Sequence, residues 1–344
     1  PKTDTVRRRY REDLSELPDW LKKKKCPNRD RYLSGKRILP QNLTGREKLA
    51  DLVDETFLAY NAARLREGAQ LLVGKMLEPD VTVGMSFAGA LTPAGLGPSC
   101  IVPLIEAGFV DWIVATGANL YHDLHFAFNC KLVAGDFRAD DRALHEVGVV
   151  RIYDVLLSRD DCLLNTDVRL RKILYQPEFQ RTMGTGELHY LLGKYAARAE
   201  AEDGLPHVSM LAAAYRNDVP VYTSSPGDST IGLEIAAIRL ARSKLVLDTF
   251  IDVNETTAFF YAAKKAGCPS AVCLWGGGSP KNFILQTAPH VTDSLGMEMK
   301  GHDYFLQVTD ARPDTGGLSG ATPHEAVSWG KVDPDFVPDA VVCY

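Results

Sequence analysis

Lys331 is the residue of this chain whose chemistry is easiest to infer, and it closes the segment 325–331, Glu-Ala-Val-Ser-Trp-Gly-Lys. A lysine acts as a nucleophile only without its proton, so it needs a desolvated pocket or a nearby cation that lowers its pKa. Trp329 lies two residues upstream, and Glu325 could orient an amine or carry its protons. The alternative is a surface lysine after a turn, which composition alone favours.

The order of residue types in 325–331 favours the catalytic interpretation, because the segment resembles the catalytic-lysine motif of the deoxyhypusine synthase family. In that family the lysine holds a 4-aminobutyl group as an imine during an NAD-dependent transfer. The resemblance therefore implies that Lys331 forms the imine and that Glu325 pairs with an ammonium or shuttles a proton. Trp329 would offer its face to the aliphatic chain and to the amines.

Glycine-containing turns follow several apolar runs and precede helical stretches, at 84–95, 114–119, 224–232 and 276–278. Small residues at such a junction let backbone N–H groups and a helix N-terminus approach a phosphate or a ribose. The first turn lacks the GxGxxG spacing, and a tight turn without a ligand explains it about as well. By themselves these turns are a weak indication of a nucleotide site.

The last three turns are similar to the NAD-binding turns of the deoxyhypusine synthase family. The resemblance implies NAD as cofactor and assigns cofactor contacts to Thr116, Gly117, Ala118, Asp123, Asp228 and Gly277. From the residues alone, Asp228 could instead cap the helix that follows it.

The positions that would bind the polyamine depart from the family pattern. His122 replaces one of two acidic residues, and Leu233 and Leu318 replace aspartates. Asn282 stands where the family has a histidine close to the reacting amine, and an amide cannot act as a general base near neutral pH. The expected substrate site is completed by His122, Asn282 and Ser319, and Ser319 lies in the loop before the lysine motif.

Two histidines, His122 and His125, are spaced as a pair of metal ligands on one helix would be. The sequence shows no evident third ligand, so we expect no metal. The seven cysteines are scattered without CxxC spacing, which argues against a disulfide framework or a zinc site and favours a reducing cytoplasm.

The elements that must position these residues are short β-branched runs, at 81–83, 112–114, 219–222, 245–247 and 271–274. Continuous apolar strands joined by helices predict an α/β fold with a parallel sheet covered on both faces. The resemblance implies that this sheet is Rossmann-like, with NAD at the strand C-terminal ends. Helical periodicity at 46–78 predicts a helix or helix pair, and the segment 138–207 is expected to be mostly helical.

We expect a basic N-terminal arm over residues 1–40 and a single NAD-binding α/β domain over 41–344. The arm could dock a few apolar residues on the body. The resemblance favours an arm that packs over the active-site entrance of a neighbouring subunit, in a homotetramer with sites between subunits.

The bulk composition, with 45% hydrophobic and 24% charged residues, is that of an ordinary globular protein. The net charge of −5 gives no general attraction to nucleic acid. No apolar run approaches the ~18 residues of a membrane helix. We therefore expect neither nucleic acid nor membrane as a partner.

Three functions stay open. The first is an NAD-dependent 4-aminobutyl-type transferase whose acceptor is a small amine such as putrescine, which would yield homospermidine. The second is a true deoxyhypusine synthase that modifies a translation-factor lysine with spermidine. The third, of another class, is an NAD-binding protein that has lost catalysis and acts as a structural protein or sensor.

Overall fold

The computed structural model describes residues 29–344, so the basic runs at 7–9 and 22–25 lie outside the described residues. The chain divides into two compact units, Pro1–Leu58 and Ala59–Tyr344. The described part of the first unit contains the helices α2 (Arg29–Tyr32) and α3 (Leu49–Thr56). Just before α3, the Glu47 carboxylate accepts hydrogen bonds from the backbone N–H of Thr44 (2.6 Å) and from its hydroxyl (2.8 Å).

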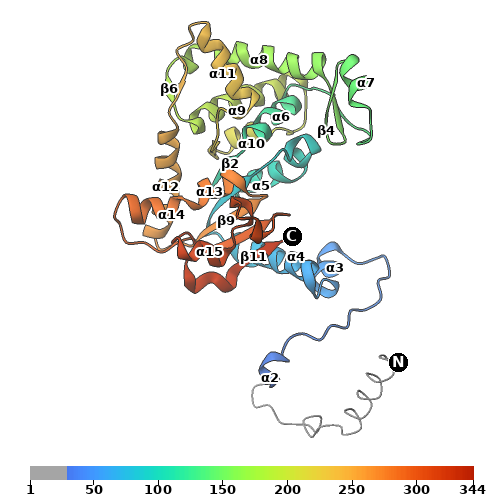
Figure 1. The fold of residues 1–344 in the computed structure, drawn as a ribbon, viewed down its shortest axis with the longest axis vertical. Coiled ribbons are helices and arrows are strands. Elements are labelled where there is room, and N and C mark those ends of the chain that lie inside the picture. Colours follow the sequence, from blue (N-terminus) through green and yellow to red (C-terminus); the bar gives the residue numbers. More distant parts are fainter. Residues whose placement is uncertain (1–28) are drawn as a thin grey trace, which may run out of the picture. The chain divides into compact units, whose positions relative to one another are not determined.

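The second unit is built on a six-stranded sheet in which every neighbouring pair of strands is parallel (Figure 1). Its strand order is β11-β10-β9-β1-β2-β7. The strands are β1 (Thr82–Phe87), β2 (Trp112–Ala115), β7 (Val221–Tyr222), β9 (Ser270–Trp275), β10 (Tyr304–Val308) and β11 (Ala340–Cys343). The first strand is central, the next two extend to one side, and the last three extend to the other. The strand order therefore reverses between β1 and β9.

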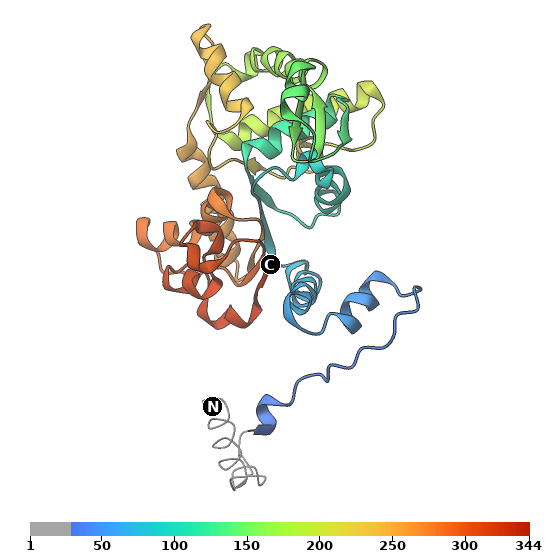
Figure 2. The ribbon, with the colours of Figure 1, turned by 45° about the vertical axis from the view of Figure 1, so that its right-hand side comes forward.

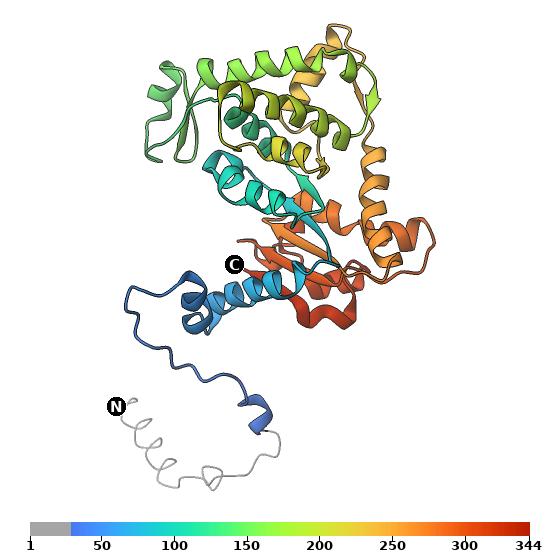
Figure 3. The same ribbon diagram turned by 180° about the vertical axis from the view of Figure 1, so that it is seen from behind.

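Side chains alternate between two hydrophobic clusters, because successive residues of a strand point to opposite faces of the sheet. On β2, Ile113 and Ala115 belong to one cluster, while Trp112 and Val114 belong to the other. Helix α4 packs against β10 and β11, and α13 packs against β1 and β2. The turned views in Figures 2 and 3 show these helices beside the sheet. The predicted Rossmann-like α/β fold, with helices on both faces, is confirmed.

The helical segments of the second unit follow the strands in the expected alternation, and the helix predicted at 46–78 is the pair α3 and α4. These segments are α4 (Tyr60–Leu71), η2 (Leu72–Met76), η3 (Thr92–Ala94), η4 (Gly97–Ile101), α5 (Val102–Glu106), α6 (Gly117–Ala127), α7 (Asp141–Glu146), η5 (Arg159–Leu164), α8 (Asn165–Leu174), η6 (Pro177–Phe179), α9 (Thr185–Asp203), α10 (Met210–Arg216), α11 (Thr230–Leu240), α12 (Thr249–Lys265), α13 (Gly278–Leu285), α14 (Thr287–Pro289), η7 (His290–Ser294), η8 (Pro313–Thr315), η9 (Leu318–Gly320), α15 (Pro323–Ser328) and η10 (Pro334–Asp339).

Two local predictions differ from the structure. The run at 245–247 is not part of the main sheet, because β8 (Val246–Leu247) pairs with β6 (Thr182–Met183). The segment 138–207 contains α8 and α9 but also strands of a small antiparallel sheet, formed by β3 (Leu132–Ala134), β4 (Val149–Ile152) and β5 (Val155–Ser158). Within residues 29–344, no helix combines the length and the hydropathy that a membrane crossing requires.

Candidate functional site

The first two turns of the site meet where the strand order reverses. The backbone N–H of Ala88, which follows β1, donates to the carbonyl of Trp275, which ends β9, at 2.9 Å. Gly276 has a φ of +83°, and a Cβ built on it would lie 3.0 Å from the Cβ of Ala88. In open parallel sheets, ligands bind in the crevice at this point, outside the carboxyl ends of the strands. The glycine turns at 84–95 and 276–278 therefore share one edge of the crevice.

The turns that follow β2 and β7 are packed against each other just as closely. Thr116 precedes α6, and its hydroxyl donates to the carbonyl of Gly89 at 2.6 Å, which ties this turn to the one after β1. A Cβ on Gly117 would lie 2.4 Å from the Cβ of Ser229, so only glycine fits there. Ala118 follows, half-buried in the first turn of α6.

Ser229, rather than Asp228, caps helix α11. The Ser229 hydroxyl accepts a hydrogen bond from the backbone N–H of Gly232 at 3.4 Å. The Asp228 side chain is exposed at the same turn. The capping role left open for Asp228 is thus taken by its neighbour, and the Asp228 carboxylate is accessible to a ligand.

Asp123 is fully buried on the opposite side of α6 from solvent and holds the start of α10. Its oxygens accept from the hydroxyl of Ser209 at 2.6 Å and from the backbone N–H groups of Met210 (2.7 Å) and Leu211 (2.9 Å). Burial raises the pKa of Asp123 to about 6, against these three hydrogen bonds. The structure gives Asp123 a positioning role, and the cofactor contact expected of it stays a prediction.

The turn after β9 also contacts the loop that leads to the lysine motif. The Ser319 hydroxyl accepts from the backbone N–H of Gly278 at 2.8 Å, and a Cβ on Gly277 would lie 2.5 Å from the Cα of Ser319. On its other side, Ser279 lies with its hydroxyl 3.4 Å from that of Ser225 in the turn after β7. The four predicted turns therefore form one continuous surface.

Lys331 is placed by the end of helix α15. The backbone N–H of Lys331 donates to the carbonyl of Ala326 (3.0 Å), and that of Gly330 donates to Val327 (2.9 Å). With Gly330 at a φ of +65°, these two bonds make a Schellman motif, in which glycine adopts the left-handed conformation after the helix. The glycine of the sequence motif thus turns the chain so that Lys331 leaves the helix in a fixed direction.

The amine of Lys331 lies in a cavity of about 260 Å³. It donates to the Oδ1 atom of Asn282 at 2.9 Å and lies 5.6 Å from the centroid of the Trp329 ring. Glu325 lines the same cavity, and so does Leu318. The other lining residues are Lys281, Leu285, Gln286, Ala321 and Ala326. The predicted residues Lys331, Asn282, Trp329 and Glu325 are therefore brought together.

Burial lowers the pKa of Lys331, and the Glu325 carboxylate opposes that shift. A lower pKa increases the fraction of neutral amine at a given pH, which is the form that attacks a carbon. The indole of Trp329 is 64% exposed and forms the outer wall beside the amine. These properties are those of a nucleophile rather than of a solvated surface lysine.

Lys281 is a second lysine at the site, and we predicted no role for it from the sequence. Its side chain is only 2% exposed and donates to the Gln307 amide oxygen (2.9 Å) and to the carbonyls of Ala321 (2.6 Å) and Ser319 (3.2 Å). Burial lowers the pKa of Lys281 to about 8, with Glu325 raising it and Lys331 lowering it. The sequence feature that could have indicated this role is the position of Lys281, three residues after Gly278 in the first turn of α13.

A larger cavity, of about 530 Å³, lies beside the first and shares three of its lining residues, Asn282, Gln286 and Trp329. Its other walls come from α12, α13, α14 and η7, and His290 is one of the lining residues. The Nδ1 atom of His290 lies 3.0 Å from the Thr257 hydroxyl. Asn282 and Trp329 therefore separate two spaces, each of which can hold part of an extended amine.

His122 lines neither of these two cavities. It lies half-buried on α6, where burial, with a smaller contribution from His125, lowers its pKa to about 4. Leu233, which also departs from the family pattern, is exposed on α11. His122 therefore does not line the cavity of Lys331, and the substrate contact predicted for it stays a prediction.

Comparison with known proteins places these features in a family. The model of the deoxyhypusine synthase family matches residues 49–344. A "Deoxyhypusine synthase-like protein" from Nostoc sp. is 54% identical over 310 residues, which cover 90% of this chain and 81% of that protein. The archaeon Methanosarcina acetivorans has a "Probable deoxyhypusine synthase 2" that is 38% identical over 276 residues, covering 80% of this chain and 76% of that protein.

A solved structure from Entamoeba histolytica, provisionally assigned as a deoxyhypusine synthase, has a similar fold, with a TM-score of 0.54 at 16% identity. The match covers 80% of this chain and 88% of that one.

Proposed function

Because the chain belongs to the deoxyhypusine synthase family, a family of transferases, we propose that it is an NAD-dependent 4-aminobutyl-type transferase acting on polyamines through an imine at Lys331. The observation that carries this proposal is the Lys331 amine, which lies in a cavity against Asn282 and Trp329 with its pKa lowered by burial. We further propose that the acceptor is a small amine such as putrescine.

The turns of the crevice have the properties that NAD requires. Apart from the adjoining chain, no heavy atom of the described residues lies within 4 Å of where a Cβ would stand on Gly89, Gly227 or Gly278, so a ligand can approach the backbone there. The helices α6, α11 and α13 begin at these turns, and helix N-termini favour phosphate. The exposed Asp228 carboxylate suits a ribose hydroxyl. NAD, when bound, would accept a hydride from the carbon beside the donor amine and later return it.

Lys331 carries the transfer itself. Its neutral amine adds to the carbon of the C=N bond of the oxidised donor, and the first amine leaves after it takes up a proton. The aminobutyl group is then held as an imine on Lys331. The acceptor amine adds to the same carbon, Lys331 leaves as a free amine, and the new C=N bond is ready for reduction.

The neighbouring side chains support these steps. Asn282 Oδ1 accepts a hydrogen bond from the amine and so orients it. Glu325, at the cavity wall, pairs with an ammonium or moves a proton between the incoming and leaving amines. Trp329 covers the alkyl chain. Leu285 and Leu318 make part of the cavity wall apolar, which suits a short alkyl amine.

Borohydride trapping tests this function. The purified protein is incubated with NAD and spermidine, reduced, and digested for mass spectrometry. We expect an aminobutyl adduct on Lys331 that is absent in Lys331→Ala and retained in Lys194→Ala, which changes an exposed lysine outside the site. NAD binding without an adduct would instead support a non-catalytic NAD-binding protein.

The acceptor is then identified by competition between putrescine, agmatine and the hypusine-bearing translation factor. Rapid formation of deoxyhypusine on the translation factor would overturn the small-amine proposal and support a true deoxyhypusine synthase. The homotetramer with sites between subunits also belongs to this proposal. Light scattering of the purified chain measures the assembly, and a monomer with full activity would contradict it.

A further inference from the structure

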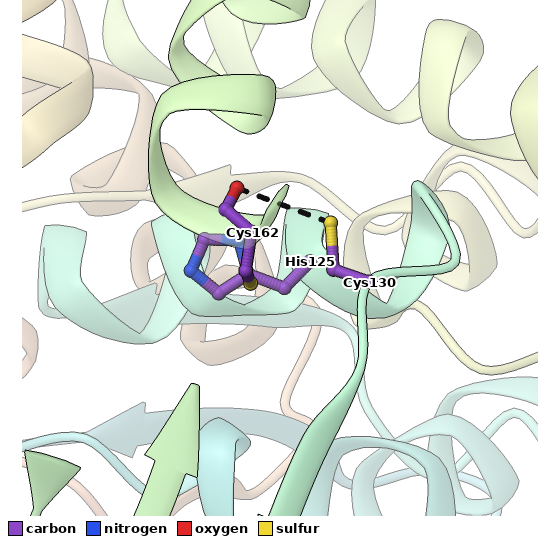
Figure 4. A group of neighbouring side chains, drawn as sticks. All are labelled: His125, Cys130 and Cys162. Atoms are coloured by element: carbon purple, nitrogen blue, oxygen red, sulfur yellow. Dashed lines mark hydrogen bonds between the residues drawn. The ribbon is translucent and has the colours of Figure 1, made fainter. Parts of the chain in front are cut away.

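A cluster of His125, Cys130 and Cys162 lies outside both cavities described above. Figure 4 shows the three side chains gathered between α6, the chain that follows it, and η5. The Nε2 or Nδ1 atom of the histidine and the two sulfur atoms all lie within 4.8 Å of one another. His125 and Cys162 are buried, and Cys130 is half-buried. Three residues distant in sequence thus place metal-binding atoms together.

The ring of His125 has one nitrogen in use and one without a partner. Its Nδ1 atom lies 2.8 Å from the Thr166 hydroxyl, while its Nε2 atom is buried and makes no hydrogen bond within the described chain. A buried polar atom without a partner is destabilising. In metal sites, one ring nitrogen of a histidine is fixed by such a neighbour while the other binds the ion. Nε2 of His125 is therefore an available ligand atom.

The two thiols add the second and third ligand atoms. The contacts around the Sγ atom of Cys130 are long, at 4.0 Å to the carbonyls of Cys162 and Phe128 and 3.7 Å to the Thr166 hydroxyl. Both sulfur atoms lie within 4.8 Å of a ring nitrogen of His125, and cysteine binds a metal as the thiolate.

We propose that His125, Cys130 and Cys162 bind one zinc-class ion. Thiolate and imidazole ligands select borderline ions such as Zn²⁺ over the oxygen-seeking Mg²⁺ and Ca²⁺. Two thiolates and a neutral imidazole balance the charge of a divalent ion, which a buried site requires. Three protein ligands leave one coordination position for water or a small molecule. This site is independent of the proposed transfer at Lys331.

Metal analysis and cobalt substitution test this site in the full-length chain. The protein is purified under thiol-reducing conditions, exposed to a weak chelator, and assayed for zinc by mass spectrometry. We expect one zinc per chain, and a cobalt form with a thiolate-to-cobalt charge-transfer band and visible d–d absorption. His125→Asn keeps a group at the Nδ1 position but removes Nε2. That variant, Cys130→Ser and Cys162→Ser should each lose the bound zinc.

Cys268→Ser is the matched control, because Cys268 is a half-buried free thiol that is absent from the cluster. It should retain the zinc content and the cobalt spectrum. Thr166→Val removes the hydroxyl that contacts both Nδ1 of His125 and the Sγ atom of Cys130, and it should weaken zinc binding by about 10- to 100-fold. Far-ultraviolet circular dichroism reports whether each variant folds, and the wild-type cobalt spectrum is decisive even if a variant does not.

Three results would overturn the proposal: zinc no higher in the wild type than in the ligand variants, a cobalt spectrum without thiolate absorption, or a Cys130–Cys162 disulfide in the protein as purified. The last result would identify the two thiols as a redox pair instead.

Discussion

The amine of Lys331 donates a hydrogen bond to the side-chain amide of Asn282 across 2.9 Å. In the family pattern, this second position is a histidine, which can both accept a hydrogen bond and titrate. Asparagine keeps the first property and lacks the second. In the proposed reaction, Asn282 therefore orients the Lys331 amine from α13 but cannot titrate, and Glu325 is the carboxylate in the same cavity that would carry protons.

Asn282→Leu should slow the formation of the Lys331 adduct without removing it. The change deletes the acceptor at 2.9 Å but keeps the side-chain volume, and a hydrogen bond to an amine of this kind contributes about 1–2 kcal/mol. We expect a loss of roughly tenfold in the trapping rate, measured at saturating NAD and spermidine. An unchanged rate would mean that Asn282 does not orient the amine.

Gly330→Ala should impair the same reaction by moving Lys331. An alanine at a φ of +65° is destabilising by about 1 kcal/mol and strains the turn after α15. Gly296→Ala is the matched control, because Gly296 has a φ of +67° and equal open space around it. Both variants should lose similar stability in thermal unfolding, but only Gly330→Ala should lose trapping rate. Equal trapping rates in the two variants would mean that the Schellman turn does not determine the position of Lys331.

Gly117→Ala should weaken NAD binding. Its new Cβ would lie 2.4 Å from Ser229, so α6 and α11 must separate at the cofactor crevice, with a loss of stability of about 1–3 kcal/mol. Gly193→Ala produces a similar clash, 2.3 Å from the Leu211 carbonyl, but between α9 and α10. Calorimetric titration with NAD should show weaker binding for the first variant alone. Comparable affinities in the two variants would argue against a cofactor at this turn.

Asp123→Asn should reduce the stability of the fold. An amide nitrogen would face N–H or O–H donors of residues 209–211, and the lost pairing is worth about 1–3 kcal/mol. Glu200→Gln is a control at the same helix start, because Glu200 accepts from the backbone N–H of Ser209 at 2.7 Å. Urea unfolding measures both losses. An NAD affinity that falls only in Asp123→Asn would support the predicted cofactor contact.

Lys281 should make stability depend on pH. Burial lowers its folded-state pKa to about 8, whereas a lysine in the unfolded chain titrates near ~10.4. Between these values the unfolded chain binds more protons, so the free energy of unfolding rises as pH increases through this window. Lys281→Met should flatten that rise, and Lys244→Met, at an exposed lysine, should preserve it. Urea unfolding across the window measures the slopes, and identical slopes would contradict the prediction.

The sequence was sufficient for four strands of the main sheet, β1, β2, β7 and β9, and for the residues of the lysine cavity, because both depend on local patterns. Apolar runs at 112–114 and 271–274 are central strands, and the segment 325–331 contains the turn that aims Lys331. Strands β10 (Tyr304–Val308) and β11 (Ala340–Cys343) were not predicted. The small antiparallel sheet was also missed, since β4 pairs only with the adjacent β5 and none of its residues is fully buried.

Contacts between segments that are distant in the sequence could not be predicted either. Nothing in the spacing of His125, Cys130 and Cys162 indicates that their side chains meet, because the intervening strands of the small sheet bring η5 back to α6. The role of Asp123 was similarly hidden, since its partners lie more than 80 residues away in sequence.

Ser319 contacts both the turn after β9, where the cofactor is proposed to bind, and residues beside the amine cavity. Its hydroxyl accepts from the backbone of Gly278 at the cofactor turn, while its carbonyl accepts from Lys281 and from Gln307 beside the amine cavity. If one ligand shifts this loop when it binds, the binding site of the other ligand changes as well. Such a link is reciprocal, so NAD and the amine should change each other's affinity by the same factor.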